Sequence, residues 1–135
     1  MERDYEKQFV REYKGFTSLS VYEEVFPIVI KTIQILQSYK RENNQGEFID
    51  LIERTQNCAV LILTSLADGY NKYHAEDKVI LYSMARSNVS NTQSLMLILG
   101  GLEIIPKSLT DKIVNEFNEK IKMFNGIIKK MEDKA

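Results

Sequence analysis

The run from Phe48 to Tyr73, FIDLIERTQNCAVLILTSLADGYNKY, decides the fold. Its apolar and small residues recur alternately four and three positions apart, the spacing of one face of an α-helix packed in a bundle. The residues of this face are Phe48, Ile52, Thr55, Ala59, Ile62, Leu66, Gly69 and Tyr73. Because Ala59 and Gly69 are small, they predict a close approach of a neighbouring helix and are our first candidates for a helix seam.

The segments on either side repeat this helical pattern. The preceding helix is predicted to begin near residue 20, where Ser20 and Glu23 have the spacing of a capping box, and to end in the polar run 40–46. The following helix is predicted to begin at Glu76 and to stop at the pair Gly100 and Gly101. Its apolar face consists of Tyr82, Ala85, Val89, Thr92, Met96 and Leu99.

A fourth helix is predicted after Ser108 and Asp111, which would cap its start. Its stripe is Ile113, Phe117, Ile121, Phe124, Ile128 and Met131. Short connections make sequential helices antiparallel neighbours, so the sequence predicts an all-α fold, an antiparallel up-and-down four-helix bundle over residues 16–135. Residues 1–15 form a charged N-terminal extension, in which Tyr5, Phe9 and Tyr13 predict a short extra helix that docks by this stripe.

Composition agrees with one globular domain. The chain has 135 residues, of which 44% are hydrophobic and 27% charged, and its formal net charge is -1. This balance excludes the bulk positive field that drives nonspecific nucleic-acid binding. The longest unbroken apolar run, Cys58 to Leu63, is far shorter than the roughly 20 residues that span a bilayer, and no secretory signal opens the chain. We expect a cytoplasmic protein that does not enter a membrane.

The sequence offers little to catalysis. Cys58 is the only cysteine and His74 the only histidine, so neither a CxxC pair nor a two-histidine metal site is available. Phosphate-binding loops, the GxSxG nucleophile turn and the HExxH zinc motif are absent. We therefore expect no enzyme activity, no metal and no cofactor.

A polar run, Arg86 to Ser94, interrupts the third predicted helix, and Val89 is its only apolar residue. A helix buried all round could not hold so many polar groups without leaving some unsatisfied. Either this face contacts solvent or a pore, or it forms a hydrogen-bonded seam between subunits, for which Asn88 and Asn91 are the candidates. Direct contact with nucleic acid is a third interpretation.

A second polar feature suggests nucleic-acid binding. Lys72 lies between Tyr70 and Tyr73, which combines a phosphate contact with rings on which bases can stack. From residue 107 to the end there are seven lysines against five acidic residues. The candidates for phosphate neutralisation are Lys72, Lys112, Lys120, Lys122, Lys129 and Lys130. The alternative is that the two tyrosines cap one end of the bundle and Lys72 is merely solvated.

The second and third helices also carry a family resemblance. The stretch from Cys58-Ala59-Val60 to Ala67-Asp68-Gly69-Tyr70, followed by Ala85-Arg86-Ser87-Asn88-Val89, resembles the small bundle proteins encoded by intervening sequences of bacterial large-subunit rRNA genes. The similarity extends over roughly residues 16 to 131 and includes stretches at both ends of that range. These stretches are Phe16-Thr17-Ser18-Leu19-Ser20-Val21-Tyr22 and Met123-Phe124-Asn125-Gly126-Ile127-Ile128-Lys129.

The same superfamily includes the accessory variability determinant of diversity-generating retroelements, and Phe26-Pro27-Ile28 is similar to a Pro-Ile position there. The resemblance implies a barrel-shaped homopentamer, and in the retroelement branch it implies binding of nucleic acid and of a reverse transcriptase. The near-neutral charge favours the rRNA-intervening-sequence branch.

Two functions from different classes follow. The first is a non-enzymatic, RNA-associated homo-oligomer that repeats a weakly basic patch. The second is a protein-binding scaffold, such as an accessory subunit of a reverse transcriptase. A structural oligomer without a nucleic-acid ligand is the simplest alternative.

Overall fold

The computed structural model describes residues 2–42 and 46–135, with side chains from Tyr5 onward. Every regular element in these ranges is helical and none is a strand, so the predicted all-α class is confirmed. In chain order the elements are α1 (Glu2–Arg11), the 3-10 helix η1 (Phe16–Ser18), α2 (Ser20–Glu42), α3 (Ile49–Tyr70), α4 (Ala75–Gly101), α5 (Lys107–Asn118) and α6 (Ile121–Lys134). Residues 43–45 of the predicted polar run lie outside the described residues.

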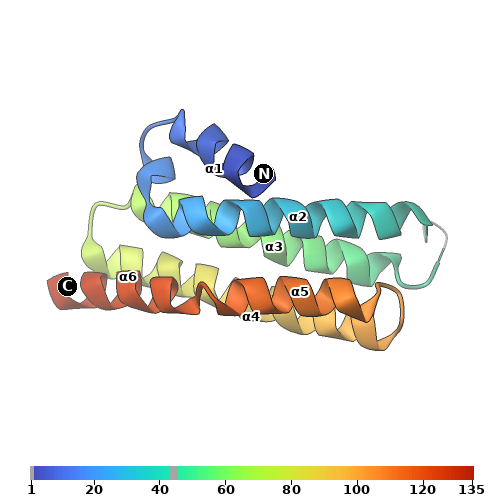
Figure 1. Ribbon diagram of the computed structural model, residues 1–135. Helices are drawn as coiled ribbons and strands as arrows, with labels where there is room; N and C mark the ends of the chain where they lie inside the picture. Colours follow the sequence, from blue (N-terminus) through green and yellow to red (C-terminus); the bar gives the residue numbers. More distant parts are fainter. Residues whose placement is uncertain (1, 43–45) are drawn as a thin grey trace.

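The long helices lie lengthwise beside one another, and their connections lie at the two ends of the molecule (Figure 1). The most extensive contacts join α3 to α4, and α2 also packs on α3. On its other side α4 contacts α5 and α6, which follow one another along its length (Figure 1). None of the described helices is both long and apolar enough to cross a bilayer.

The predicted helix faces form the core. From Ile52 to Gly69 every residue of the α3 face is buried, and so is every residue of the predicted face of α4. The two ends of the predicted face lie outside the helix: Phe48, before α3 begins, is half-buried, and Tyr73, after α3 ends at Tyr70, projects from the turn with 92% of its surface exposed. Burial therefore follows the helical period within α3, and this pattern ends where the helix ends.

Two predicted caps differ from the structure. The first residue of α5 is Lys107, preceded by Pro106, and no side chain caps it. Ser108 thus lies inside the first turn, and the Asp111 carboxylate pairs with the Lys107 ammonium 2.5 Å away. With Ser108 as the cap the helix would begin at residue 109, so it begins two residues earlier than predicted, directly after Pro106, whose extended backbone occupies the cap position.

The end of α4 also has a different cause from the one predicted. Gly100 and Gly101 are both helical, and the left-handed residue that ends the helix is Glu103, with a φ of 60°. The Ile104 amide donates to the Leu99 carbonyl at 3.0 Å, as in a Schellman motif. Gly100 serves packing instead, because a Cβ there would lie 2.7 Å from the Thr110 hydroxyl oxygen on α5.

The predicted fourth helix is two helices. It is interrupted at Glu119 and Lys120, where the Lys120 amide donates to the Phe117 carbonyl in a tighter, three-residue turn. Phe117 and Phe124, on either side of the interruption, are both fully buried. The apolar stripe therefore continues across a break in the backbone, which is why periodicity alone does not show it.

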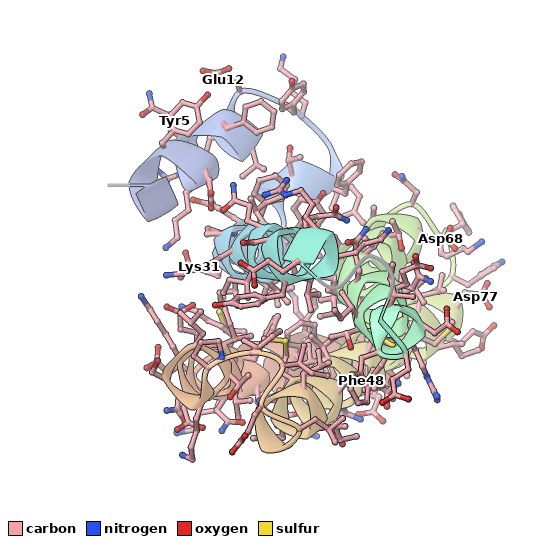
Figure 2. All side chains as sticks on the ribbon, turned by 90° about the vertical axis from the view of Figure 1, so that its right-hand side faces the viewer. Tyr5, Glu12, Lys31, Phe48, Asp68 and Asp77 are labelled. Atoms are coloured by element: carbon pink, nitrogen blue, oxygen red, sulfur yellow. The ribbon has the colours of Figure 1, made fainter. Side chains whose placement is uncertain are left out.

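The N-terminal extension does form a helix, α1, but it docks differently from the prediction. Tyr5 and Tyr13 are 70% and 56% exposed, whereas Val10 is buried and Phe9 stacks on Phe26 of α2 at 6.1 Å between ring centroids. Figure 2 shows Tyr5 pointing away from the body of the molecule. Phe9 of the predicted stripe therefore docks on α2, whereas Tyr5 and Tyr13 stay exposed and the fully buried residue is Val10.

Candidate nucleic-acid interface

The turn between α3 and α4 presents an unpacked aromatic ring. Tyr73 and His74 lie edge to face, with 5.0 Å between ring centroids and planes at 89°. Both side chains are exposed, and Lys72, beside them, is exposed as well. An exposed ring next to an ammonium group has the chemistry that stacks a base and contacts a phosphate.

Tyr70, the second predicted stacking residue, is engaged within the chain. The Lys78 ammonium lies 5.4 Å from the centre of its ring and donates hydrogen bonds to the carbonyls of Tyr70, at 2.5 Å, and Gly69, at 3.3 Å. These bonds satisfy carbonyls that a helix end leaves without partners. Lys78 therefore fixes the turn, and the prediction that the tyrosines cap the end of the bundle fits Tyr70 but not Tyr73.

Three of the six candidate lysines have ion-pair partners. Lys72 lies 3.5 Å from Asp68 and Lys129 lies 3.5 Å from Asp133, each one helical turn away. Such exposed pairs are weak and leave the ammonium able to exchange partners. Lys120 differs, because its side chain is mostly buried and its ammonium lies 3.0 Å from the Glu24 carboxylate.

Glu24 joins three parts of the fold. It binds Lys7 of α1 at 2.6 Å and Lys120, at the start of α6, while projecting from α2. The hydrogen bonds from Lys7 and Lys120, together with their charges, outweigh the effect of burial and hold the pKa of Glu24 below its ordinary value. Lys120 is therefore a structural residue, and sequence reasoning could not find its partner because they are 96 positions apart.

The structure brings only part of the predicted lysine set together. The α3–α4 turn and the last turns of α6 lie at the same end of the molecule, which we call the turn end (Figure 1). Lys72, Lys129 and Lys130 belong to these segments. Lys112 lies on α5, which begins at the opposite end, and Lys122 is in the first turn of α6. Lys112, Lys122 and Lys130 are exposed, and none has an ion pair within the described part of the chain.

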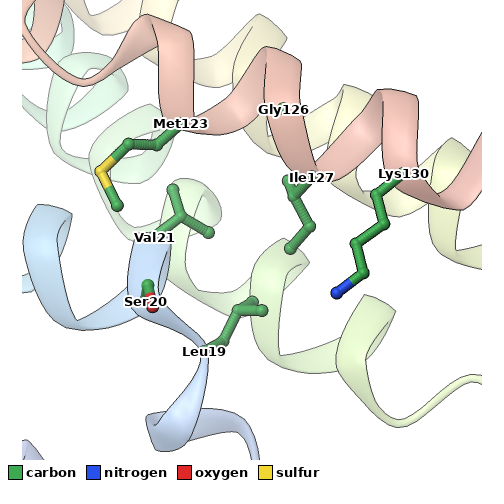
Figure 3. A pocket seen from close by; sticks show the side chains of 7 residues that line it. All are labelled: Leu19, Ser20, Val21, Met123, Gly126, Ile127 and Lys130. Carbon is green, nitrogen blue, oxygen red and sulfur yellow. The ribbon is translucent and has the colours of Figure 1, made fainter.

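Lys130 borders a shallow hollow of about 320 Å³ between the start of α2 and α6. Leu19, Val21, Met123 and Ile127 provide its apolar wall, and the Lys130 side chain extends along its edge (Figure 3). The backbone of Gly126 lies open here, since a Cβ built on it meets nothing within 4 Å. The hollow thus combines an apolar wall with the ammonium group of Lys130 at its edge.

Two residues of the polar run of α4 form hydrogen bonds to α5 and α6. Arg86 donates to the Asn125 side-chain oxygen on α6 at 2.9 Å, and Gln93 donates to the Val114 carbonyl and the Asn118 side chain at 2.9 and 2.8 Å. These bonds fasten α4 to both sides of the α5–α6 break. The sequence shows the polar residues but not this pairing, because the break itself is not evident from it.

Of the four residues predicted to form a helix seam, two are fully buried and two, Asn88 and Asn91, are not. Ala59 and Gly69 are buried, and Gly69 touches α4 so closely that a Cβ would lie 2.8 Å from Tyr82, whose phenol pKa is raised by burial. These two residues form a seam within the chain. Asn91 is exposed on α4, whereas the half-buried Asn88 donates to the Met84 carbonyl of its own helix at 3.0 Å.

Within the described residues, no three side chains of histidine, cysteine, aspartate or glutamate gather closely enough to hold a metal ion. Cys58 is half-buried on α3, and His74 is exposed at the turn. No family model, no curated protein and no solved structure matches the chain. Since no comparison points to a site, the candidate nucleic-acid site is chosen from the chemistry of the side chains alone. It is the turn end, with Lys72, Tyr73, Lys129 and Lys130.

Proposed function

We propose that this chain is a non-enzymatic, homo-oligomeric protein that associates with RNA through the turn end. In this proposal α2, α3, α4 and the α5–α6 pair form an antiparallel up-and-down four-helix bundle. Because apolar side chains fill its interior, the residues that bind RNA lie on its surface. Support for the arrangement comes from connections at alternate ends and from the contacts of α3 with both α2 and α4 (Figure 1).

The exposure of Tyr73 carries the proposal. A ring with 92% of its surface exposed contributes nothing to the core, and it lies beside Lys72 at the end where α6 brings Lys129 and Lys130. Stacking on such a ring does not require a particular base, so a single-stranded RNA is the ligand that fits. The few lysines make each contact weak, and several copies in one assembly would raise the avidity. The resemblance to rRNA-intervening-sequence proteins implies five copies.

The test is binding of a labelled single-stranded RNA, followed by fluorescence anisotropy at 50 and 200 mM salt. We expect the wild-type affinity to fall at least tenfold across this range, because the lysines displace counterions from phosphates. Tyr73→Ala should weaken binding at least fivefold, since one stacked base contributes roughly 1–3 kcal/mol. Tyr5→Ala is the matched control, because Tyr5 is also an exposed tyrosine but lies on α1.

Lysine variants provide a second comparison. Lys130→Ala should reduce the affinity and its dependence on salt, while Lys112→Ala, on α5, should change neither. Absence of binding at 50 mM salt, or equal losses for Tyr73→Ala and Tyr5→Ala, would refute RNA association at the turn end.

A protein-binding scaffold is the second candidate, and the outer surface of α4 favours it. Ile80 and Leu97 are 59% and 52% exposed there, which is unusual for large apolar side chains on a solvated helix. A reverse transcriptase encoded beside this chain, and purified with it after coexpression, would support an accessory subunit. Stable self-assembly without binding of RNA or of such an enzyme would leave a purely structural oligomer.

A further inference from the structure

A second hollow lies at the turn end, between the end of α3 and the start of α4. Its volume is about 330 Å³, and it is lined by Asp68, Lys72, Asp77, Ile80 and Leu81. Figure 2 shows Asp68 and Asp77 on the same side of the molecule, away from α1. The site, which we call the Asp77 hollow, thus places two carboxylates and one ammonium group beside two apolar side chains.

Contacts within the chain hold the walls of the Asp77 hollow in place. Gly69, which follows Asp68, lies so close to α4 that a Cβ on it would be 3.1 Å from the Leu81 Cβ. Lys78, which follows Asp77, donates a hydrogen bond to the Gly69 carbonyl at 3.3 Å. The two carboxylates therefore project from helix ends that are fixed relative to one another, and a ligand meets a preformed site.

The charged groups of the hollow are not all engaged. The Lys72 ammonium lies 3.5 Å from Asp68, in an exposed pair that leaves it able to contact a ligand as well. Asp77 is half-buried, and its carboxylate has no hydrogen-bond or ion-pair partner in the described part of the chain. An ionised carboxylate only accepts hydrogen bonds, so Asp77 favours a ligand that carries donors. It disfavours a phosphate, which brings negative charge and acceptors.

The apolar side of the hollow favours a flat ligand. Ile80 is 59% exposed and Leu81 is half-buried, so a planar ring can lie against them while its polar edge meets the charged groups. A nucleobase has this combination of an apolar face and a hydrogen-bonding edge. Because Lys72 and Tyr73 are consecutive, the hollow lies within reach of the nucleotide next to the one that stacks on Tyr73.

Guanine is the base whose edge fits these groups. It presents two adjacent donors, N1–H and the N2 amino group, which one carboxylate can bind with both of its oxygens. Its O6 acceptor lies beside them and is an atom that lysine contacts. Adenine and cytosine each place a single amino group next to an unprotonated ring nitrogen, and uracil has one N–H between two carbonyls. These three bases therefore set an acceptor against the carboxylate.

We propose that the Asp77 hollow binds an unpaired guanine of a single-stranded RNA. The Asp77 carboxylate accepts hydrogen bonds from N1–H and the N2 amino group, and the Lys72 ammonium donates to O6. Lys129 and Lys130 are then the residues that contact phosphates. The inference rests on the RNA association in the proposed function and adds a base preference to it, since Tyr73 stacks any base and the hollow selects its neighbour.

The test compares short single-stranded RNAs that differ at one nucleotide, with binding followed by fluorescence anisotropy at 50 mM salt. An oligouridine with one central guanosine should bind the wild type at least fivefold more tightly than the plain oligouridine. A central adenosine or cytidine should give no such gain. Inosine, which lacks the N2 amino group, should lose most of the gain, and this comparison requires no change in the protein.

Protein variants test the residue that reads the base. Asp77→Asn should bind the guanosine-containing RNA no more tightly than the oligouridine, because an amide presents one acceptor and no charge. Its affinity for oligouridine should not fall. Glu76→Gln is the matched control, since Glu76 is the exposed neighbour in the first turn of α4 and does not line the hollow. This variant should keep the preference for guanosine.

The outcomes separate the guanine site from RNA association itself. Equal binding of oligouridine and of the guanosine-containing RNA, or a stronger gain from adenosine or cytidine, would overturn the guanine site alone. A guanosine preference that survives in Asp77→Asn would overturn it as well. Absence of binding to every one of these RNAs would instead refute the proposed function, and the guanine site with it.

Discussion

Gly69 is the residue at which the sequence specifies helix packing most directly. A Cβ there would lie 2.8 Å from the Tyr82 ring and 3.1 Å from the Leu81 Cβ, both on α4. We expect Gly69→Ala to lower the free energy of unfolding by about 1–3 kcal/mol, because the two helices must separate to admit the methyl group. Urea denaturation measures the change.

Gly126→Ala is the control for that variant. Gly126 lies inside α6, where an added Cβ meets nothing within 4 Å. The substitution should raise the free energy of unfolding by about 0.5–1 kcal/mol, since alanine loses less conformational freedom in a helix. Equal destabilisation by both variants would mean that Gly69 is not a close contact.

Glu24 predicts a pH dependence of stability. Its pKa lies below its ordinary value of 4.5 in the folded chain, chiefly because of the hydrogen bond from Lys7. As the pH falls, the unfolded chain binds the proton first, so the contribution of Glu24 is complete above about pH 5 and is lost below that. Glu24→Gln should cost about 1 kcal/mol near pH 7 and much less near pH 3.5, as urea titrations at both values would show.

Glu12 provides the comparison for this effect. It is exposed on the segment after α1 and points away from the body of the molecule (Figure 2). Glu12→Gln should give only a small difference from the wild type, because its side chain is exposed. A Glu24→Gln difference that is equally large at both pH values would contradict the ion-pair origin of the stabilisation.

At the scale of the helices, α3 and α4 could be predicted from the sequence and the α5–α6 pair could not. The faces of α3 and α4 are uninterrupted runs of buried residues at helical spacing. The α5–α6 break leaves Phe117 and Phe124 both buried, so the apolar period passes through it without a signal. The break depends on contacts with other helices, which one segment of sequence does not contain.

We expect the Gln93 side chain to stabilise this break between α5 and α6. Its side-chain amide donates to the Val114 carbonyl and to Asn118, just before the interruption. Gln93→Ala should lower the free energy of unfolding by about 1–2 kcal/mol, because both acceptors lose a partner. Amide exchange should also become faster at residues 118–123 than in the rest of α5 and α6.

Ser94→Ala tests whether the effect belongs to the hydrogen bonds. Ser94 is the exposed neighbour of Gln93 on α4, and alanine is the better helix former. This variant should be as stable as the wild type or slightly more so, with unchanged exchange at the break. Faster exchange in Ser94→Ala as well would assign the effect to α4 in general.

At the scale of the whole molecule, the candidate site could be predicted only where it is local. Lys72 and Tyr73 are adjacent in the sequence and remain together at the turn. Lys112 and Lys120 belong to the predicted lysine set, yet one lies on α5 away from the turn end and the other pairs with Glu24. Charge counted along a segment cannot show which lysines meet an acid that lies far away in the sequence.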